Sequence, residues 1–510
     1  MSALETEKKT IPQDVVVYSD DYKKLLDAKA YAGKYYEIDE RVEEICKEAF
    51  KGCDKLEEIV MPKKLKKIDS EAFQGCSSLT KLTLPDSVTS IGKGAFCGCS
   101  GLTKLTLPDS VTIIGDGAFQ GCSGLTELTL PNCVRVVEAC AFKDCSGLTK
   151  LTLPNILINI WESAFEGCSG LTELTLPNSV TSIADDAFRG CSGLTKLTLP
   201  SRVASIGRWA FYGCSGLTKL TLSNSLTEIG YNAFRGCSSL TELTLPNSVT
   251  EIGDNAFRGC SSLTELTLPN SVTSIGESAF AYCSDLEKIT VESGNSRYDS
   301  RDNCNSIVET ETNTLIVGCK NSIIPNSVTS IGESAFRGCS GLTELTLPNS
   351  ITSIGEYAFY SCRGLTELTL PNGVTSIEES AFQGCSGLAK ITSLAEIPPV
   401  CGFKVFNGVN KTNCELIVPE GSVAAYKQAE VWNEFSNISG FSGVEDTVAD
   451  GNTIRAIGNQ IEIIGYFTSV EVYGINGALI YKGKDNVVTV PSAGIYLVHV
   501  AGKTRKIVVE

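Results

Sequence analysis

The residues of this chain that could do chemistry are its cysteines, one histidine and a few adjacent carboxylates. His499 is the only histidine, and it alternates with Val498 and Val500, which predicts a solvent-facing position on a strand. Without a second histidine, no Cys–His or Ser–His pair can be assembled in the repeats. Asp185 and Asp186 could share acid and base roles, but we expect them at a coil corner in a structural role. We therefore predict no enzyme, no catalytic residue and no cofactor.

Most of the 22 cysteines follow a fixed spacing, which argues against a disulfide framework. Stacked coils place such residues in one column, about 5 Å apart, where free cysteine behaves as a small buried hydrophobe. Ligands in one column cannot surround zinc tetrahedrally. We favour a ladder of buried thiols over bridges. The regularly spaced cysteines are Cys53, Cys76, Cys99, Cys122, Cys145, Cys168, Cys191, Cys214, Cys237, Cys260, Cys283, Cys339, Cys362 and Cys385.

The elements that must position these residues repeat with a period of 23. A fixed period of this size predicts a solenoid, in which one coil stacks on the next and offers a long surface without an obvious pocket. The series is carried by an Ala-Phe-x-x-Cys motif, interrupted once. Its phenylalanines are Phe50, Phe73, Phe96, Phe119, Phe142, Phe165, Phe188, Phe211, Phe234, Phe257, Phe280, Phe336, Phe359 and Phe382.

One repeat shows the expected course of the chain. Leu102, Leu105 and Leu107 give L-x-x-L-x-L, the short strand of leucine-rich repeats, with alternate side chains turned inward. Residues 111–114 predict a second short extended segment. Residues 116–119 predict one helical turn or a short 3₁₀ piece. We expect a β-rich leucine-rich-repeat solenoid whose phenylalanines form a spine between the two strand layers.

The pattern LTxLTLPxSVTSIGxxAFxGCSG resembles the BspA-like leucine-rich repeat, a class known mainly from surface proteins of Bacteroidetes and from some protozoa. The match runs from about Tyr35 to Leu388, and the signature recurs with few changes. The resemblance implies a right-handed coil with sheets on its faces. It also implies a role in adhesion to host or bacterial surface molecules.

The departures from the repeat predict the domain boundaries. Residues 1–34 form an N-terminal segment and cap, with a helix expected from about Ser19 to Tyr31. The solenoid spans 35–395. Its variant repeat at 291–324 alternates like a hairpin and could be a longer coil or a binding loop.

The chain after the solenoid resembles the closing parts of the same bacterial proteins. A C-terminal cap at 396–440 should hold a strand at Glu415–Val418 and a helix at Ser422–Trp432, followed by a linker at 441–453. Short strands separated by glycines predict a β-sandwich at 454–510. Its end, GIYLVHVAGKTRKIVVE, resembles the sorting domain of the Bacteroidetes type IX secretion system, which implies export.

Charge and hydropathy limit the partners and the location. A formal charge of −16 disfavours nucleic acid and anionic membranes. No apolar run approaches the roughly 20 residues of a spanning helix. The first residues lack the apolar region of a signal peptide, so either the protein stays inside the cell or a leader has been removed. We expect a monomer at the cell surface or secreted.

Two sets of outward residues are candidate contacts for an extracellular protein or glycan. A charged column and a threonine column run along the first strands, and Trp, Tyr and Arg interrupt the consensus elsewhere. Solubility and drift between repeats would explain the same residues. The candidate partner-binding residues are Lys104, Thr106, Glu127, Thr129, Lys150, Trp161, Trp209, Tyr212, Tyr231, Tyr357 and Tyr360.

The function predicted from these observations is non-enzymatic binding of a protein or glycan in adhesion. Two alternatives stay open. One is a structural surface spacer without a specific ligand, and the other is a secreted hydrolase with an unrecognised site.

Overall fold

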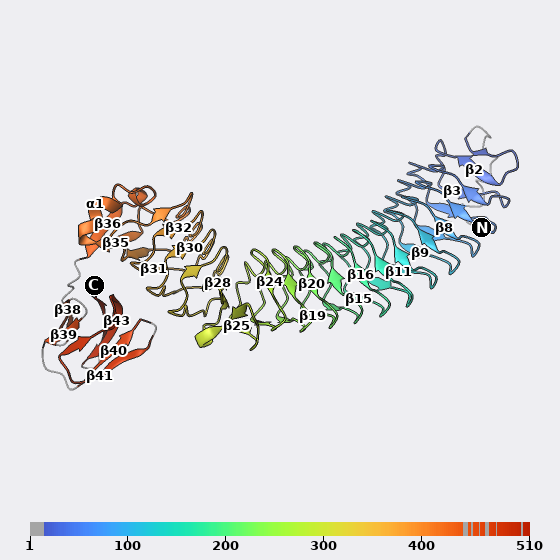
Figure 1. The fold of residues 1–510 in the computed structure, drawn as a ribbon. Coiled ribbons are helices and arrows are strands. Elements are labelled where there is room, and N and C mark those ends of the chain that lie inside the picture. The colour runs from blue at the N-terminus through green and yellow to red at the C-terminus, as the bar shows by residue number, and fades with distance from the viewer. Residues whose placement is uncertain are drawn as a thin grey trace. The chain divides into compact units, whose positions relative to one another are not determined.

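The computed structural model of the chain describes residues 15–441, 447–449, 452–457, 460–464, 469–475, 477–500 and 503–509. It divides into two compact units, and Figure 1 draws the strands that build them as arrows. The first runs to Leu263 and includes Ser271–Phe280, and the second comprises Thr264–Asn270 and the chain from Ala281. The start of the predicted N-terminal segment, residues 1–14, and residues 442–446, 450 and 451 of the predicted linker lie outside the described residues.

Each coil of the first unit contributes one strand to a parallel sheet. The strands lie in chain order, and equivalent residues pair in register, as Leu82 does with Leu105. From β7 onward their central leucine is buried and its two neighbours are exposed, as the alternation of a strand requires. These strands are β3 (Tyr35–Glu37), β5 (Glu58–Val60), β7 (Lys81–Thr83), β9 (Lys104–Thr106), β11 (Glu127–Thr129), β13 (Lys150–Thr152), β15 (Glu173–Thr175), β17 (Lys196–Thr198), β19 (Lys219–Thr221) and β21 (Glu242–Thr244).

A second strand in each coil, two residues long except for β2, builds two further sheets, one from β1 (Val17–Tyr18) to β10 and one from β12 to β24. One residue of each strand faces the core and the other faces outward. The parallel strands are β2 (Lys24–Asp27), β4 (Glu44–Ile45), β6 (Lys67–Ile68), β8 (Ser90–Ile91), β10 (Ile113–Ile114), β12 (Val136–Val137), β14 (Asn159–Ile160), β16 (Ser182–Ile183), β18 (Ser205–Ile206), β20 (Glu228–Ile229), β22 (Glu251–Ile252) and β24 (Ser274–Ile275).

The repeat phenylalanines form the predicted spine. Their rings stack nearly parallel from coil to coil, with centroids 4.9 Å apart at Phe50 and Phe73 and 5.6 Å apart at Phe257 and Phe280. The Phe50 amide donates to the carbonyl of Ala72 in the next coil, so the corner is also tied by backbone hydrogen bonds. Each ring is buried between the two strand layers, which makes the spine the centre of the core.

The cysteines of the motif form the predicted ladder of thiols. All 22 cysteines are free. The Sγ of Cys76 donates to the carbonyl oxygen of Phe50 at 3.2 Å, and Cys237 does the same to Phe211 at 3.4 Å. Burial raises the pKa of the Cys145 and Cys214 thiols to about 12. Each thiol therefore acts as a protonated donor that satisfies a buried carbonyl of the coil before it.

Two predictions of helix in the repeats and the cap were wrong. Residues 17–27 hold the antiparallel pair β1 (Val17–Tyr18) and β2, and residues 19–31 contain no helix, because the Ser19 and Asp21 side chains bond within the turn between the two strands. The corner at residues 116–119 is a turn without 3₁₀ helix, since Gly117 has a φ of 59°.

The second unit continues the parallel stacking. Strands β23 (Glu265–Leu268) and β25 (Lys288–Val291) pair in parallel, and a four-stranded and a seven-stranded sheet follow. The four-stranded sheet is β31 (Glu367–Leu370), β33 (Lys390–Ser393), β35 (Glu415–Pro419) and β36 (Asn437–Phe441). The seven-stranded sheet is β26 (Tyr298–Asp299), β27 (Ile307–Glu309), β28 (Thr314–Val317), β29 (Ser330–Ile331), β30 (Ser353–Ile354), β32 (Ser376–Ile377) and β34 (Val400–Cys401).

The segment after the last repeat covers the core with aromatic side chains. Trp432 and Tyr426 are fully buried, and Trp432 donates to the carbonyl of Pro399 at 2.9 Å. The predicted strand at Glu415–Val418 is present as β35. The predicted helix at 422–432 is wrong in its length: η3 (Glu420–Ser422) and α1 (Val423–Tyr426) are followed separately by η4 (Trp432–Glu434), since Val431 has a φ of 70°.

Two four-stranded antiparallel sheets end the chain and share one core of valines and isoleucines with Ala456 and Tyr496. Residues 447–449, within the predicted linker, form an edge strand of the first sheet. The first sheet is β37 (Thr447–Ala449), β38 (Asn452–Ile457), β39 (Gln460–Ile464) and β42 (Val487–Thr489). The second is β41 (Leu479–Gly483), β40 (Val470–Gly474), β43 (Gly494–Val500) and β44 (Lys503–Val509).

Candidate functional site

The candidate residues on the first strands lie together on the exposed face of one sheet. Lys104 and Thr106 are on β9, Glu127 and Thr129 on β11, and Lys150 on β13. Glu127 pairs in register with Lys104 on one side and Lys150 on the other. Alternating charges on adjacent strands stabilise a sheet, so these residues also support the scaffold itself.

The candidate aromatic residues fall at coil corners, outside the core. Trp161 is 49% exposed and follows β14, and Tyr231 is 38% exposed and follows β20. Trp209 is half-buried, and its ring meets the Tyr231 ring edge-on at a centroid distance of 5.1 Å and an angle of 88°. The fold thus brings Trp209 and Tyr231 together and leaves Trp161 in an earlier coil.

Trp209 occupies a backbone position that suits other residue types. Its φ is 52°, in the left-handed region, where Asp186 and Asn232 stand in the coils before and after it. Short polar side chains tolerate this conformation, whereas a bulky ring there is an outlier. The Asn232 side chain behind Trp209 is only 1% exposed, while the equivalent Asn255 of the following coil is half-buried. The indole ring packs against the next coil, where it meets the ring of Tyr231.

The remaining candidate tyrosines lie against arginines. The ring of Tyr212 has the guanidinium carbons of Arg189 and Arg235 at 5.3 and 5.7 Å from its centroid. In the second unit, Tyr357 and Tyr360 meet edge-on at 5.8 Å, and the Arg337 guanidinium lies over both. These are cation–π contacts between neighbouring coils, which stabilise the stack and present flat polar–aromatic surfaces.

A groove of about 670 Å³ opens beside the Trp209–Tyr231 pair, entirely within the first unit. It crosses five coils, along the outward residues of β16, β18, β20, β22 and β24 and the corners that follow them. The lining residues are Ser182, Ile183, Ala184, Asp185, Ser205, Ile206, Gly207, Arg208, Trp209, Glu228, Gly230, Tyr231, Glu251, Ile252, Gly253, Asp254, Ser274 and Gly276.

The groove carries four carboxylates against one guanidinium. Asp185 and Asp254 are held by the scaffold, since an Oδ1 of each accepts a backbone N–H, from Arg208 at 2.7 Å and from residue 277 at 2.9 Å. Glu228 and Glu251 are exposed and pair directly in register. The sequence predicted a structural role for Asp185 and Asp186, and the hydrogen bonds that Asp185 accepts from Arg208 and Asp186 from Arg189 support it. The sequence did not point to the two glutamates, because the residue at their position varies from coil to coil.

The Glu228–Glu251 pair differs from the charge pairs elsewhere in its column. In the early coils, Glu44 faces Lys67 at the equivalent position and forms an ion pair of 3.0 Å. Among the described residues, neither Glu228 nor Glu251 has an ion-pair partner. Like charges on directly paired residues repel, and with four carboxylates and one guanidinium in its lining the groove carries a net negative charge.

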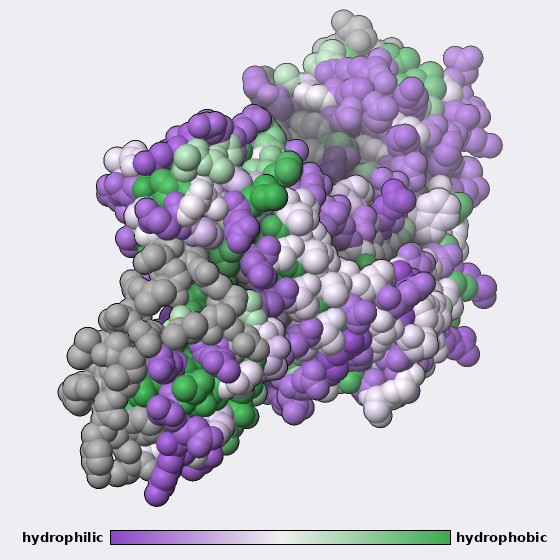
Figure 2. Space-filling view, turned by 60° about the vertical axis from the view of Figure 1, so that its left-hand side comes forward, coloured by the Kyte–Doolittle hydropathy of each residue, from purple (hydrophilic) through white to green (hydrophobic). Residues whose placement is uncertain are grey.

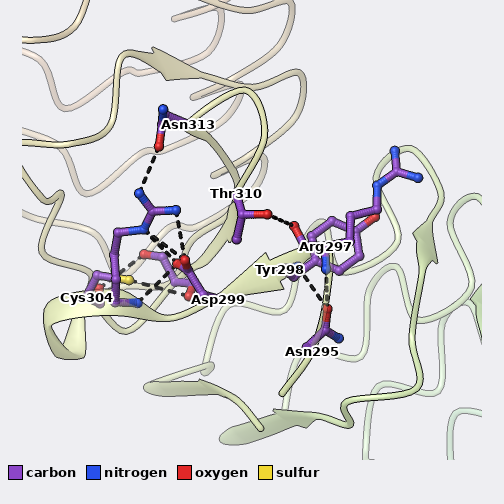
Figure 3. A network of polar contacts seen from close by, with 9 residues as sticks. Asn295, Arg297, Tyr298, Asp299, Cys304, Thr310 and Asn313 are labelled. Carbon is purple, nitrogen blue, oxygen red and sulfur yellow. Dashed lines mark hydrogen bonds and ion pairs between the residues drawn. The ribbon is translucent and has the colours of Figure 1, made fainter. Parts of the chain in front are cut away.

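The variant repeat at 291–324 is built into the solenoid wall of the second unit. Its strands β26 and β27 pair antiparallel, and β28 joins the parallel sheet through β29. Figure 3 shows the polar network that holds it: the Arg301 guanidinium bonds Asp299 at 2.8 Å and Asn313 at 2.8 Å. Cys304 beside them is fully buried. These polar groups are engaged with one another, which favours the longer coil over the binding loop.

The surface and the side-chain clusters of the described residues give no sign of a metal centre or a membrane span. No group of three or more His, Cys, Asp or Glu side chains in the described ranges could hold a metal ion. In the same part of the chain, no helix has the length and apolarity needed to cross a bilayer. On the face that Figure 2 shows, hydrophobic residues are scattered among hydrophilic ones.

Comparison with protein families identifies the repeat. The family model described as "BspA type Leucine rich repeat region (6 copies)" matches residues 32–148, 89–215, 181–308 and 316–415. The chain belongs to the BspA-type leucine-rich repeat family. Members of this family are generally non-catalytic repeat proteins. The resemblance seen in the sequence is therefore confirmed for the repeats.

Solved structures of other bacterial repeat proteins are similar to this BspA-type chain. A leucine-rich repeat protein from Bacteroides ovatus ATCC 8483 is 25% identical with a TM-score of 0.52, and the match covers 85% of this chain and 100% of that one. A leucine rich cell surface protein from Faecalibacterium prausnitzii A2-165 is 27% identical with a TM-score of 0.36, over 54% and 92%. No curated protein matches the sequence.

Proposed function

We propose that this protein is a non-enzymatic cell-surface or secreted repeat protein whose solenoid binds an extracellular protein or glycan in adhesion. The observation that carries the proposal is the placement of aromatic side chains outside the core, at the corners of a rigid stack. Trp161 and Tyr231 are exposed, and Trp209 lies beside Tyr231 at a groove. Exposed aromatic residues on a rigid scaffold are typical anchors of interfaces.

The intact chain should bind a member of a panel of matrix proteins, mucins and glycans, with saturation. Its three tryptophans provide a readout, because Trp161 and Trp209 lie outside the core and Trp432 is fully buried. Ligand bound at the corners should shift the emission of the wild type. The same ligand should not shift the emission of a W161F/W209F variant, which retains only Trp432. Absence of saturable binding to the whole panel by a folded chain would contradict the proposal.

A structural spacer is the second candidate, and one observation favours it. On the exposed face of the first strands, Glu127 stands in register between Lys104 and Lys150, so opposite charges alternate from coil to coil. A spacer predicts that substitutions of the Thr106 and Thr129 column alter stability alone. Loss of panel binding on replacing those threonines with serine, without a change in melting temperature, would exclude it.

We propose that the two C-terminal sheets act as an export and sorting domain of the type IX kind. The support is the resemblance of the last residues and a self-contained antiparallel core, from Ile454 to Val509. Residues 447–510 fused to a periplasmic reporter should carry it to the surface of a bacterium that has this secretion system. The same fusion in a strain without the system should stay in the periplasm, and equal surface exposure in both strains would contradict the proposal.

A further inference from the structure

We propose that the groove between residues 182 and 276 binds an extended cationic segment of a partner protein, with lysine or arginine side chains at Glu228 and Glu251. This assignment rests on the proposed function, since it names the class of partner and the site. The groove lies on the outer side of the second strands of the first unit, across the face of a parallel sheet in which β16, β18, β20 and β22 are each paired on both sides. Recognition must therefore come from side chains.

The charge of the groove selects a cation. Glu228 and Glu251 are register neighbours, about 4.8 Å apart in strand spacing, with no ion-pair partner among the described residues. Asp185 and Asp254, at the corners that follow β16 and β22, add two further carboxylates to the lining. Arg208 is the single cation in the lining. An ammonium or guanidinium group seated between the two glutamates would relieve their repulsion, which a neutral sugar cannot do and an acidic sugar would increase.

The aromatic pair gives the groove an apolar wall. The Trp209 and Tyr231 rings stand perpendicular to one another, and both residues line the groove. The methylene stems of lysine and arginine pack on such rings, and their charged ends interact with the ring faces. The outward residues of five coils cover about 20 Å, the length of about six residues of an extended peptide.

The probe that tests the assignment is a fluorescein-labelled peptide of eight alternating lysine and threonine residues, measured by fluorescence anisotropy with the full chain. We expect saturable binding that weakens as salt is raised, because the contacts are charged and exposed. The corresponding glutamate–threonine peptide should not bind. A chitin hexasaccharide serves as the neutral glycan probe.

The variants use residues that the repeat itself places at equivalent positions, so that the fold is kept. E228S/E251S introduces the serine found at 205 and 274, and W209N introduces the asparagine found at 232 and 255. We expect about fivefold or greater loss of affinity for the first variant and about tenfold for the second. The matched control D86N/D109N removes two carboxylates that stand at the same position of adjacent coils, outside the groove. This control should bind the peptide as the wild type does.

The outcomes separate this assignment from the proposed function. Equal weakening by E228S/E251S and D86N/D109N would mean non-specific charge attraction and would overturn it. The assignment would also be overturned if the chitin hexasaccharide bound, and if W209N abolished that binding while E228S/E251S preserved it, because the groove would then be a glycan site. If a panel ligand binds the wild type and E228S/E251S alike while the lysine peptide fails to bind, the groove assignment falls and the proposed function stands.

Discussion

Phe211 shows how one side chain serves three coils. Its ring stacks on Phe188 at 5.4 Å and on Phe234 at 5.3 Å, and its carbonyl accepts the thiol of Cys237. The motif therefore couples ring and thiol: the phenylalanine fills the interior, and the cysteine of the next coil adds a second hydrogen bond to a carbonyl that already accepts the Cys214 amide. Cysteine suits this place because it is small, apolar and still able to donate.

Replacing Phe211 with alanine should lower the free energy of unfolding by about 3–5 kcal/mol, because the cavity lies between two stacked rings that cannot collapse into it. Chemical denaturation followed by far-ultraviolet circular dichroism measures the loss. Tyr212→Phe, next in sequence and half-buried, is the control and should cost far less. A wild-type midpoint for the Phe211 variant would contradict a buried spine.

The thiol ladder should make the protein sensitive to alkali. Burial raises the pKa of Cys145 and Cys214 to about 12, from an ordinary value of about 9 in the unfolded chain. Below about pH 9 both states keep these protons. Between about pH 9 and 12 the unfolded state loses them first, so stability falls as the pH rises. Denaturation midpoints between about pH 8 and 11 should decrease less steeply in C145A/C214A, and equal slopes would refute this origin.

At the scale of the element, the sequence predicted the features that recur every 23 residues and missed the features that occur once. The strands around Leu105, the phenylalanine spine and the thiol column follow from spacing alone. The N-terminal segment was predicted as a helix because Ser19 and Asp21 resemble a cap, whereas their oxygens bond the backbone of a hairpin turn. The groove could not be found, since nothing in the sequence shows that Trp209 and Tyr231 meet.

The corners depend on glycine where the chain takes a left-handed conformation. Gly236 has a φ of 76°, and an added Cβ would lie 3.7 Å from Gly213, so there is room for a methyl group but a poor backbone geometry. Gly236→Ala should therefore cost about 1–2 kcal/mol in the free energy of unfolding, measured by urea denaturation. Gly236→Asn should cost less, because asparagine tolerates this region. Equal losses for both would show that contact and not conformation limits the site.

At the scale of the whole molecule, each unit has its own aromatic stack. One stack runs from Phe50 to Phe280 in the first unit, and another from Phe336 to Phe406 in the second. Stability in a solenoid is a sum of terms between neighbouring repeats, so separate stacks can lose their order at different temperatures. The single chain is thus expected to unfold as more than one cooperative block.

Calorimetry of the full chain should resolve two main transitions. Phe211→Ala should lower the transition of the first unit and leave the other in place, and Phe359→Ala, in the stack of the second unit, should do the reverse. If either substitution lowers one common transition by the same amount, the chain unfolds as a single block.

The hydrogen bonds between coils join residues at a constant separation, which is one repeat for Thr103 to Thr80 and for Thr218 to Thr195. Duplication or loss of one whole repeat by recombination in the gene would therefore leave every column aligned and every interior carbonyl satisfied. Such a chain can grow or shrink during evolution in steps of a single coil, without passing through an intermediate that fails to fold. The reach of the protein can change in this way while the chemistry of its surfaces is inherited intact.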